Sequence, residues 1–298
     1  MHTIDVARPV RALASLTALA VGDAFGSQFF VPDNRPHLVD RELPPGPWQW
    51  TDDTEMAASV HAEAVRGGTV DPDRLAASFA RHHDVDRGYG PATGRMLRQV
   101  REGGDWRTLA SELFDGSGSF GNGAAMRVAP LGAWWAGDPR AAAEQAAVTA
   151  RVTHTHPEAV DGAMAVAVAA SLVAGDTAWA PGPLLDGVVA RLPAGRMREA
   201  VRGARLLLVA SDPVGAARAL GNGSRVSALD TVPFTLWAAA RHGKGFASAM
   251  WATVAAGGDV DTTCAIVAGV LGAGPPGGRV PPEWAARTEP LPAWALVD

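Results

Sequence analysis

Apolar residues recur every three or four positions along most of the chain, which is the period of an amphipathic α-helix. Proline, Asp, Ser or Thr precedes many of these segments and glycine follows several, as expected at helix starts and ends. The sequence lacks the alternating runs of Val, Ile, Thr and aromatic residues that predict hairpins. The pattern predicts helices at Val10–Val21, Glu55–Val65, Pro72–His82, Ala124–Trp135, Arg140–Val152, Pro157–Val173, Met197–Ala210, Val232–Ala240, Phe246–Ala255 and Thr263–Leu271.

These segments predict an all-α protein with a single domain over residues 1–298, because no low-complexity linker or fixed-period repeat divides the chain. The 34 glycines and 22 prolines suit short helices joined by tight loops. Two longer loops, Val31–Trp50 and Phe114–Gly123, are expected to shape a site. The segment from Gly274 onward is expected to be an irregular tail. Gly-Asn-Gly occurs at Gly121–Gly123 and Gly221–Gly223 with different flanks, which we interpret as coincidence.

Net charge, cysteine content and the length of apolar runs exclude several kinds of partner and site. The formal net charge of -5 provides no basic surface for a nucleic-acid backbone, so nucleic acid is not an expected partner. The single cysteine, Cys264, excludes an intramolecular disulfide and a thiolate zinc cluster. No apolar run approaches the roughly twenty residues that span a bilayer, and Met1–Val21 is interpreted as a buried helix and not as a signal peptide. We expect a soluble, cytoplasmic protein with no membrane contact.

Two acidic segments, Thr51–Glu55 and Gly257–Thr263, stand just before apolar helices. Either one alone is explained by helix capping and by the helix dipole. Their four aspartates, with the hydroxyls of Thr51 and Thr262, offer an all-oxygen ligand set that selects Mg²⁺, Mn²⁺ or Ca²⁺ over zinc. Four carboxylates around one divalent ion would be only half neutralised, which favours two ions. The predicted metal ligands are Thr51, Asp52, Asp53, Asp259, Asp261 and Thr262.

A glycine-rich segment and a histidine pair supply further candidates. Successive amides in a glycine-rich loop ahead of a helix can point at one spot, which is an anion-binding arrangement suited to a diphosphate. Phe120 could stack on a base or simply pack. His154 and His156 are candidates for ligand contact or capping, with a hydrogen-bonded structural role as the alternative. The loop residues are Gly118, Ser119, Phe120, Gly121, Asn122 and Gly123.

Seven motifs, in order over nearly the whole chain, resemble the ADP-ribosylglycohydrolase family. This family includes the dinitrogenase-reductase-activating glycohydrolase and the ADP-ribosylarginine and ADP-ribosylserine hydrolases. The motifs are G-D-A-F-G at Gly22, T-D-D-T at Thr51, R-G-Y-G-P at Arg87, G-N-G-A-A-M-R at Gly121, T-H-T-H-P at Thr153, D-T-V-P at Asp230 and G-G-D-V-D-T at Gly257.

The resemblance implies a compact, orthogonal multi-helix fold, usually monomeric, with two Mg²⁺ or Mn²⁺ ions held by the six residues named above. It implies that the Gly118–Gly123 loop binds the diphosphate and adenosine side of ADP-ribose, that His154 lines the distal ribose, and that Tyr89 belongs to the substrate site. The implied reaction releases ADP-ribose from an ADP-ribosylated protein or a small conjugate. Asp52 or Asp53 would take the proton of the attacking water.

Two departures from the family pattern bear on specificity. Phe30 stands where serine-linkage members carry a glutamate, which favours an arginine linkage over a serine linkage. Val260 replaces the threonine that usually separates Asp259 from Asp261, and this removes a hydroxyl but no carboxylate. The alternatives are a non-catalytic ADP-ribose or nucleotide-binding protein, a hydrolase of serine-linked or small-molecule conjugates, and a phosphohydrolase that cuts the diphosphate.

Overall fold

The computed structural model describes residues 7–176, 178–209, 212–274 and 279–296. Within these ranges the chain forms α-helices and short 3-10 turns, and the only extended pairing is two isolated bridges, which confirms the all-α prediction. The helices are α1 (Ala7–Ser27), α2 (Arg35–Asp40), α3 (Asp52–Gly67), α4 (Pro72–His82), α5 (Pro91–Arg101), α6 (Trp106–Glu112), α7 (Gly123–Met126), α8 (Ala129–Trp134), α9 (Pro139–Arg151), α10 (Pro157–Gly175), α11 (Pro181–Val189), α12 (Arg196–Leu206), α13 (Pro213–Leu220), α14 (Ala228–His242), α15 (Phe246–Val254), α16 (Val260–Gly272) and α17 (Pro282–Ala285).

The alanine- and valine-rich helix α10 lies in the core, where it packs against α7, α8, α9, α14 and α16. A helix that is apolar on every side is buried on every side. By length and composition α10 is the one helix of the described chain that could cross a membrane, yet 67% of that stretch is buried inside the fold. Its apolar surface is therefore used for internal packing.

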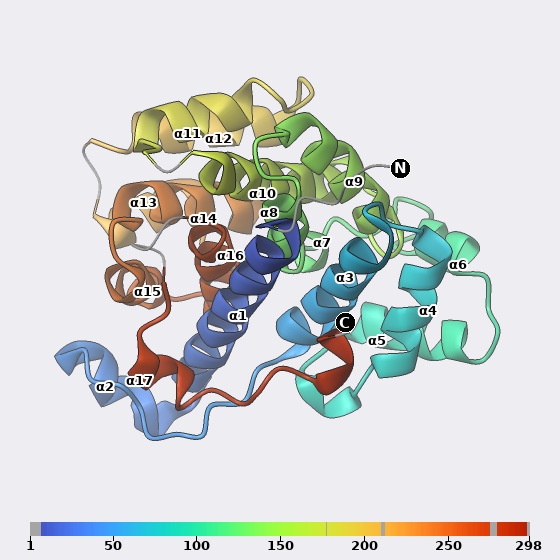
Figure 1. Ribbon diagram of the computed structural model, residues 1–298, viewed down its shortest axis with the longest axis horizontal. Coiled ribbons are helices and arrows are strands. Elements are labelled where there is room, and N and C mark those ends of the chain that lie inside the picture. The colour runs from blue at the N-terminus through green and yellow to red at the C-terminus, as the bar shows by residue number, and fades with distance from the viewer. Residues whose placement is uncertain (1–6, 177, 210–211, 275–278, 297–298) are drawn as a thin grey trace.

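Helices α1 and α16 lie side by side and bring together segments that are distant in sequence (Figure 1). A Cβ atom on Gly22 would overlap Ala268 of α16, so glycine allows the two backbones to approach closely. Ser15 Oγ donates a hydrogen bond to the Gly269 carbonyl at 2.7 Å across this contact. The pairing places Asp23 beside the N-terminal end of α16.

Several boundaries differ from the sequence prediction. The single helix expected at Ala124–Trp135 is two helices, α7 and α8, because Pro130 has no N–H to donate to the carbonyl four residues earlier. The Val31–Trp50 loop contains α2, and the segment after Gly274 contains α17. The predicted end of one helix at Ala210 lies outside the described residues.

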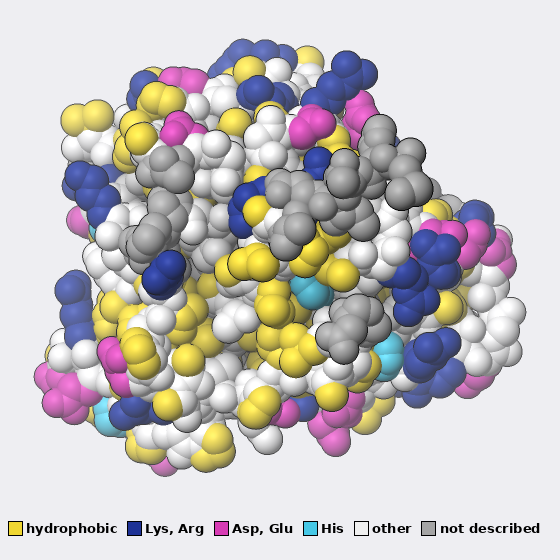
Figure 2. Space-filling model, viewed as in Figure 1, with side chains coloured by type: hydrophobic (Ala, Val, Ile, Leu, Met, Phe, Trp, Pro, Cys, Tyr) yellow, Lys and Arg dark blue, Asp and Glu magenta, His cyan; other side chains and the backbone are white. Residues whose placement is uncertain are grey.

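Figure 2 shows the same face in space-filling form, with hydrophobic side chains across the middle and charged side chains of both signs around the rim. This mixed rim agrees with the small net charge of -5. The face shown therefore offers no continuous basic surface to a polyanion.

Candidate active site

Asp23 organises the first turn of α3 from the neighbouring helix α1. Its side chain is fully buried and accepts hydrogen bonds from the backbone amides and the hydroxyls of both Thr51 and Thr54, at 2.5 to 3.1 Å. Burial raises the pKa of Asp23 to about 6, although these four hydrogen bonds oppose the shift. Asp23 thereby fixes the position at which Asp52 and Asp53 enter α3.

The two predicted acidic segments meet at this point. Asp53, only 1% exposed, lies so close to Asp23 and Asp261 that one carboxylate oxygen of each is within 4.8 Å of the others. Thr262 Oγ1 reaches Asp53 Oδ2 at 3.4 Å, which joins the first turns of α3 and α16 directly. Of the predicted metal ligands, the structure therefore brings Asp53 and Asp261 together with the hydroxyls of Thr51 and Thr262, and it adds Asp23 to the cluster.

The carboxylates of this cluster are difficult to ionise together. Burial, followed by repulsion from Asp23, raises the pKa of Asp52 to about 8. Burial and the neighbouring acids also raise the pKa values of Asp53 and Asp261 well above the usual range of a carboxyl group. Such crowding of desolvated acids is costly unless a cation neutralises it.

Helix capping explains the acidic residues at the start of α3 only in part, and it does not explain those at the start of α16. Thr51 is the N-cap of α3, and its hydroxyl accepts from the Asp53 amide at 3.4 Å. Asp259 occupies the N-cap position of α16 without a side-chain capping bond. Its Oδ2 instead accepts a hydrogen bond from Asn122 Nδ2 at 2.7 Å. The carboxylate of Asp259 is therefore turned toward the glycine-rich loop.

The donor set fits a hard divalent cation. Its possible ligands are carboxylate and hydroxyl oxygens, the type that Mg²⁺, Mn²⁺ and Ca²⁺ bind. Asp53 Oδ1 is buried and has no hydrogen-bond partner within the described residues. A buried carboxylate oxygen without a donor is the observation that a bound cation would explain.

The Gly118–Gly123 loop lies against the histidine-containing motif that begins at Thr153. Gly118 has φ of +72°, and a Cβ there would overlap Thr155. The amides of Gly118, Gly121 and Asn122 donate to Leu113 O, Ser119 Oγ and Val226 O. In the described chain this leaves the amides of Ser119, Phe120 and Gly123 without a protein acceptor. Fewer amides are therefore available to an anion than the glycine-rich sequence suggests.

Three predicted substrate residues differ in their exposure. Phe120 is 42% exposed and packs edgewise near His156. His154 is only 3% exposed and lies beneath the loop, where Gly121 and Gly123 face its ring. Tyr89 is half-buried, and its hydroxyl donates to Glu55 Oε2 at 2.6 Å. The Tyr89 hydroxyl therefore uses its hydrogen inside the protein and could meet a ligand only as an acceptor.

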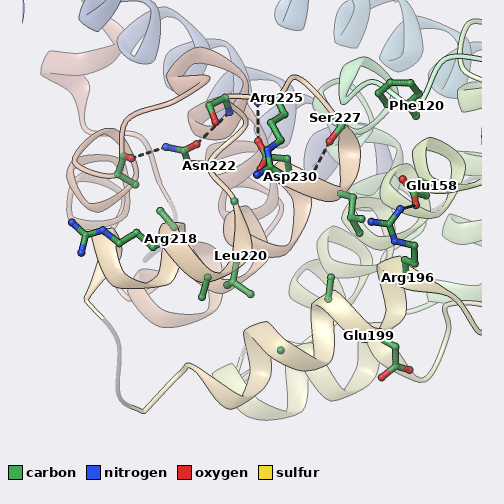
Figure 3. Close-up of a pocket in the computed structure, with 18 of the residues that line it drawn as sticks. Phe120, Glu158, Arg196, Glu199, Arg218, Leu220, Asn222, Arg225, Ser227 and Asp230 are labelled. Carbon is green, nitrogen blue, oxygen red and sulfur yellow. Dashed lines mark hydrogen bonds and ion pairs between the residues drawn. The ribbon is translucent and has the colours of Figure 1, made fainter. Parts of the chain in front are cut away.

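A cavity of about 1240 Å³ opens beside Phe120, between α12, α13 and the 221–230 loop. Figure 3 shows Phe120 and the Glu158–Arg196 pair on one side and Asn222, Arg225 and Asp230 on the other. Asn222 also closes one side of the acidic cluster, because its carbonyl accepts from the Asp259 amide at 3.1 Å. The cavity therefore borders the glycine-rich loop at Phe120, and its lining residue Asn222 contacts the backbone of Asp259.

A family model described as ADP-ribosylglycohydrolase matches residues 5–297 of the chain. The chain belongs to the ADP-ribosylglycohydrolase family. A solved structure titled "ADP-ribosylglycohydrolase-related protein complex" superposes with a TM-score of 0.68 at 28% identity, and covers 97% of this chain and 95% of that one. This confirms both the suspected family and its multi-helix fold.

Several relatives carry specific names, and two of these names state what the relative acts on. The ADP-ribosyl-[dinitrogen reductase] glycohydrolase of Rhodospirillum rubrum is 32% identical over 49% of this chain and 52% of its own length. The ADP-ribosylarginine hydrolase Tri1 of Pseudomonas putida is 31% identical over 51% of this chain and 43% of its own length. These two alignments span about half of each relative. ADP-ribosylglycohydrolases are hydrolases, so this member is an enzyme.

Sequence reasoning missed two features of this ADP-ribosylglycohydrolase site. Asp23 lies within the G-D-A-F-G motif and has no predicted role, although an aspartate inside an apolar helix is a signal in itself. The second Gly-Asn-Gly, at Gly221–Gly223, was interpreted as coincidence, and this was wrong. Asn222 bonds to the Asp259 backbone, and a Cβ on Gly223 would lie 2.5 Å from Asp259 Cβ. Both copies of the tripeptide thus flank Asp259.

Proposed function

We propose that the protein is a divalent-metal-dependent hydrolase that cleaves the glycosidic bond between ADP-ribose and an arginine side chain and releases ADP-ribose. The observation that carries the proposal is the meeting of three aspartates, Asp23 of α1 with Asp53 and Asp261 of the first turns of α3 and α16, whose carboxylate oxygens lie within 4.8 Å of one another. The proposed ligands are Thr51, Asp52, Asp53, Asp259, Asp261 and Thr262, which would hold two Mg²⁺ or Mn²⁺ ions.

The chemistry required is hydrolysis at the distal ribose, through a transition state with positive charge on the sugar. Bound cations would supply charge that fixes the ribose hydroxyls and acidifies a water molecule. Asp52 is half-buried and faces the loop at Gly88, so it is the better placed of the two candidate bases, with Asp53 enclosed behind it. Asp52 would take the proton of the water as the leaving group departs.

The substrate would run from the acidic cluster toward Phe120. The Ser119, Phe120 and Gly123 amides are the donors proposed for the diphosphate. Phe120 and the adjoining cavity of about 1240 Å³ offer space for the adenosine end. This arrangement places the bond to be cleaved at the carboxylates and the nucleotide outside them.

An arginine linkage is favoured because it needs no strong acid from the enzyme. A guanidine leaves readily once protonated, whereas an alkoxide leaving group requires a proton donor. Phe30, 53% exposed, provides no carboxylate at the position where serine-linkage members have one. The arginine specificity named for Tri1 is the parallel among the relatives.

The test is release of free ADP-ribose from arginine-linked and serine-linked peptides in parallel, with Mg²⁺ and with chelator. We expect release from the arginine peptide only, lost with chelator and in Asp53→Asn. Asp73→Asn, which alters an exposed carboxylate paired with Arg107, is the matched control and should stay active. Appearance of AMP would instead indicate a phosphohydrolase, and binding of ADP-ribose without turnover of any conjugate would indicate a non-catalytic reader.

A further inference from the structure

Arg127 is a fully buried cation with only neutral hydrogen-bond partners. Its Nη2 group donates to the Thr149 carbonyl and to Thr153 Oγ1, both at 2.9 Å, while Nη1 approaches Met56 Sδ at 3.5 Å. The guanidinium lies over the Phe79 ring at 4.5 Å. Guanidinium nitrogens donate and never accept. In its contact with Arg127, Thr153 Oγ1 is therefore the acceptor.

The orientation of the Thr153 hydroxyl follows from this contact. Thr153 is 1% exposed, and its Oγ1 lies 2.7 Å from His154 Nδ1. These are the two polar neighbours of Oγ1 in the described chain. If Nδ1 carried a hydrogen and donated it, the hydroxyl hydrogen of Thr153 would have no acceptor in a buried place, which is unfavourable. If the hydroxyl donates to Nδ1, Thr153 Oγ1 accepts from Arg127 and donates to His154, so both of its contacts are satisfied.

His154 is consequently an acceptor at Nδ1 and, as a neutral imidazole, must carry its hydrogen on Nε2. Burial and the nearby Arg127 lower the pKa of His154 to about 3, so the ring stays neutral at physiological pH. The Arg127 cation beside the ring and the hydroxyl donor at Nδ1 thus both favour the neutral imidazole with its hydrogen on Nε2.

The Nε2 edge faces the glycine-rich loop. A Cβ added to Gly121 would lie 3.2 Å from Nε2, and one added to Gly123 would lie 3.1 Å from it. Nε2 has no hydrogen-bond partner within the part of the chain that the structure describes. Two glycines therefore leave this nitrogen uncovered on the side where the proposed function places ADP-ribose.

We infer that Arg127 and Thr153 are positioning residues that fix His154 in its Nε2–H form, so that the imidazole donates a hydrogen bond to an oxygen of the ligand held at the Gly121–Gly123 loop. The proton arrangement stands on the protein geometry alone. Only the identity of the ligand, ADP-ribose, rests on the proposed function. Without the Thr153 hydroxyl, the Nδ1–H form has no penalty, and Nε2 would then face a ligand oxygen as an acceptor and repel it.

The tautomer can be measured in the ligand-free protein by long-range ¹H–¹⁵N correlation of the imidazole nitrogens, with the His154 signals assigned from their loss in His154→Gln. Wild type and Thr153→Ser, which keeps a hydroxyl, should both give the Nε2–H pattern. Thr153→Val, which keeps the shape without the hydroxyl, should give a mixture or the Nδ1–H pattern. Thr253→Val is the matched control, because it removes another fully buried hydroxyl that bonds only within its own helix.

Calorimetric binding of ADP-ribose provides the second readout. Thr153→Val should weaken binding by about tenfold, the effect of one lost hydrogen bond, and Thr153→Ser should restore it. An Nδ1–H pattern in wild type, or an unchanged Nε2–H pattern in Thr153→Val, would overturn the inference. Equal affinity of the valine and serine variants would overturn the donor role. A wild-type protein that shows the Nε2–H pattern but binds no ADP-ribose would support the proton arrangement and contradict the proposed function.

Discussion

Asn122 Nδ2 donates to Asp259 Oδ2 at 2.7 Å and to Thr231 Oγ1 at 3.1 Å. This buried amide joins the glycine-rich loop to the acidic cluster and to the start of α14. A ligand of a metal keeps its orientation through such outer hydrogen bonds. The position of the Asp259 carboxylate therefore depends on the loop that is proposed to bind the nucleotide.

Replacing Asn122 by alanine should weaken the binding of metal before it affects folding. The expected result is an increase of about 10- to 100-fold in the Mg²⁺ concentration for half-maximal activity, the usual effect of losing an outer-shell partner. A Mg²⁺ titration of ADP-ribose release measures it. Gln145→Ala, an amide that bonds to the Val70 amide far from the acids, is the control. An unchanged Mg²⁺ requirement in Asn122→Ala would contradict this role.

Asp53→Asn should preserve the stability of the metal-free protein while it weakens the binding of metal. Because the change removes one desolvated carboxylate from a crowded cluster, the unfolding temperature in chelator should equal or exceed that of wild type. The gain in unfolding temperature on adding Mg²⁺, which follows from selective binding to the folded state, should be largely lost. Thermal unfolding with and without Mg²⁺ measures both, and a full Mg²⁺-dependent gain in the variant would argue against Asp53 as a ligand.

The metal-free protein should become less stable as pH rises. The folded-state pKa values of Asp23 and Asp52, about 6 and about 8, lie above the value of about 3.9 for an unfolded aspartate. Between these values the folded state holds protons that the unfolded state has released, so the free energy of unfolding falls with increasing pH. Unfolding curves in chelator across pH 4 to about 8 test this. Added Mg²⁺ should reduce the fall, because bound cations favour the ionised carboxylates.

Two glycines with similar backbone conformations provide a matched pair. Gly116 and Gly118 both have positive φ, +81° and +72°, but a Cβ on Gly116 meets nothing within 4 Å whereas one on Gly118 would overlap Thr155. Gly116→Ala should cost only the left-handed conformation, about 1 to 2 kcal/mol. Gly118→Ala should cost clearly more in urea unfolding and should also reduce activity, because the loop must move. Equal losses would show that the contact with Thr155 is unimportant.

Periodicity predicted long helices such as α10, whose apolar positions repeat over several turns, but it did not predict α5, which has 11 residues. Short helices such as α6, of 7 residues, were not recognised, because so few residues contain little periodic signal and are stabilised mainly by their neighbours. The break between α7 and α8 could have been read from Pro130. It was hidden by apolar residues on both sides of the proline.

The acids of the site were found from sequence because their chemistry is visible in the residue types. The residues that hold them in place were not, since Asp23 acts on Thr54 from 31 positions away and Asn222 acts through its backbone carbonyl. Arg127 and Thr153 belong to quoted motifs, but their roles appear only when hydrogen-bond directions are followed in three dimensions. Ligand candidates can be read from composition, whereas supporting contacts require the fold.

The pairing of α1 with α16 determines when the enzyme can become active. The Ser15–Gly269 hydrogen bond joins residues 254 positions apart, and the acidic cluster needs residues from α1, α3 and α16 at once. A nascent chain on the ribosome that has not yet produced α16 has only the carboxylates of the two earlier helices. The three-carboxylate cluster can therefore form only in a chain that has been synthesised at least through α16.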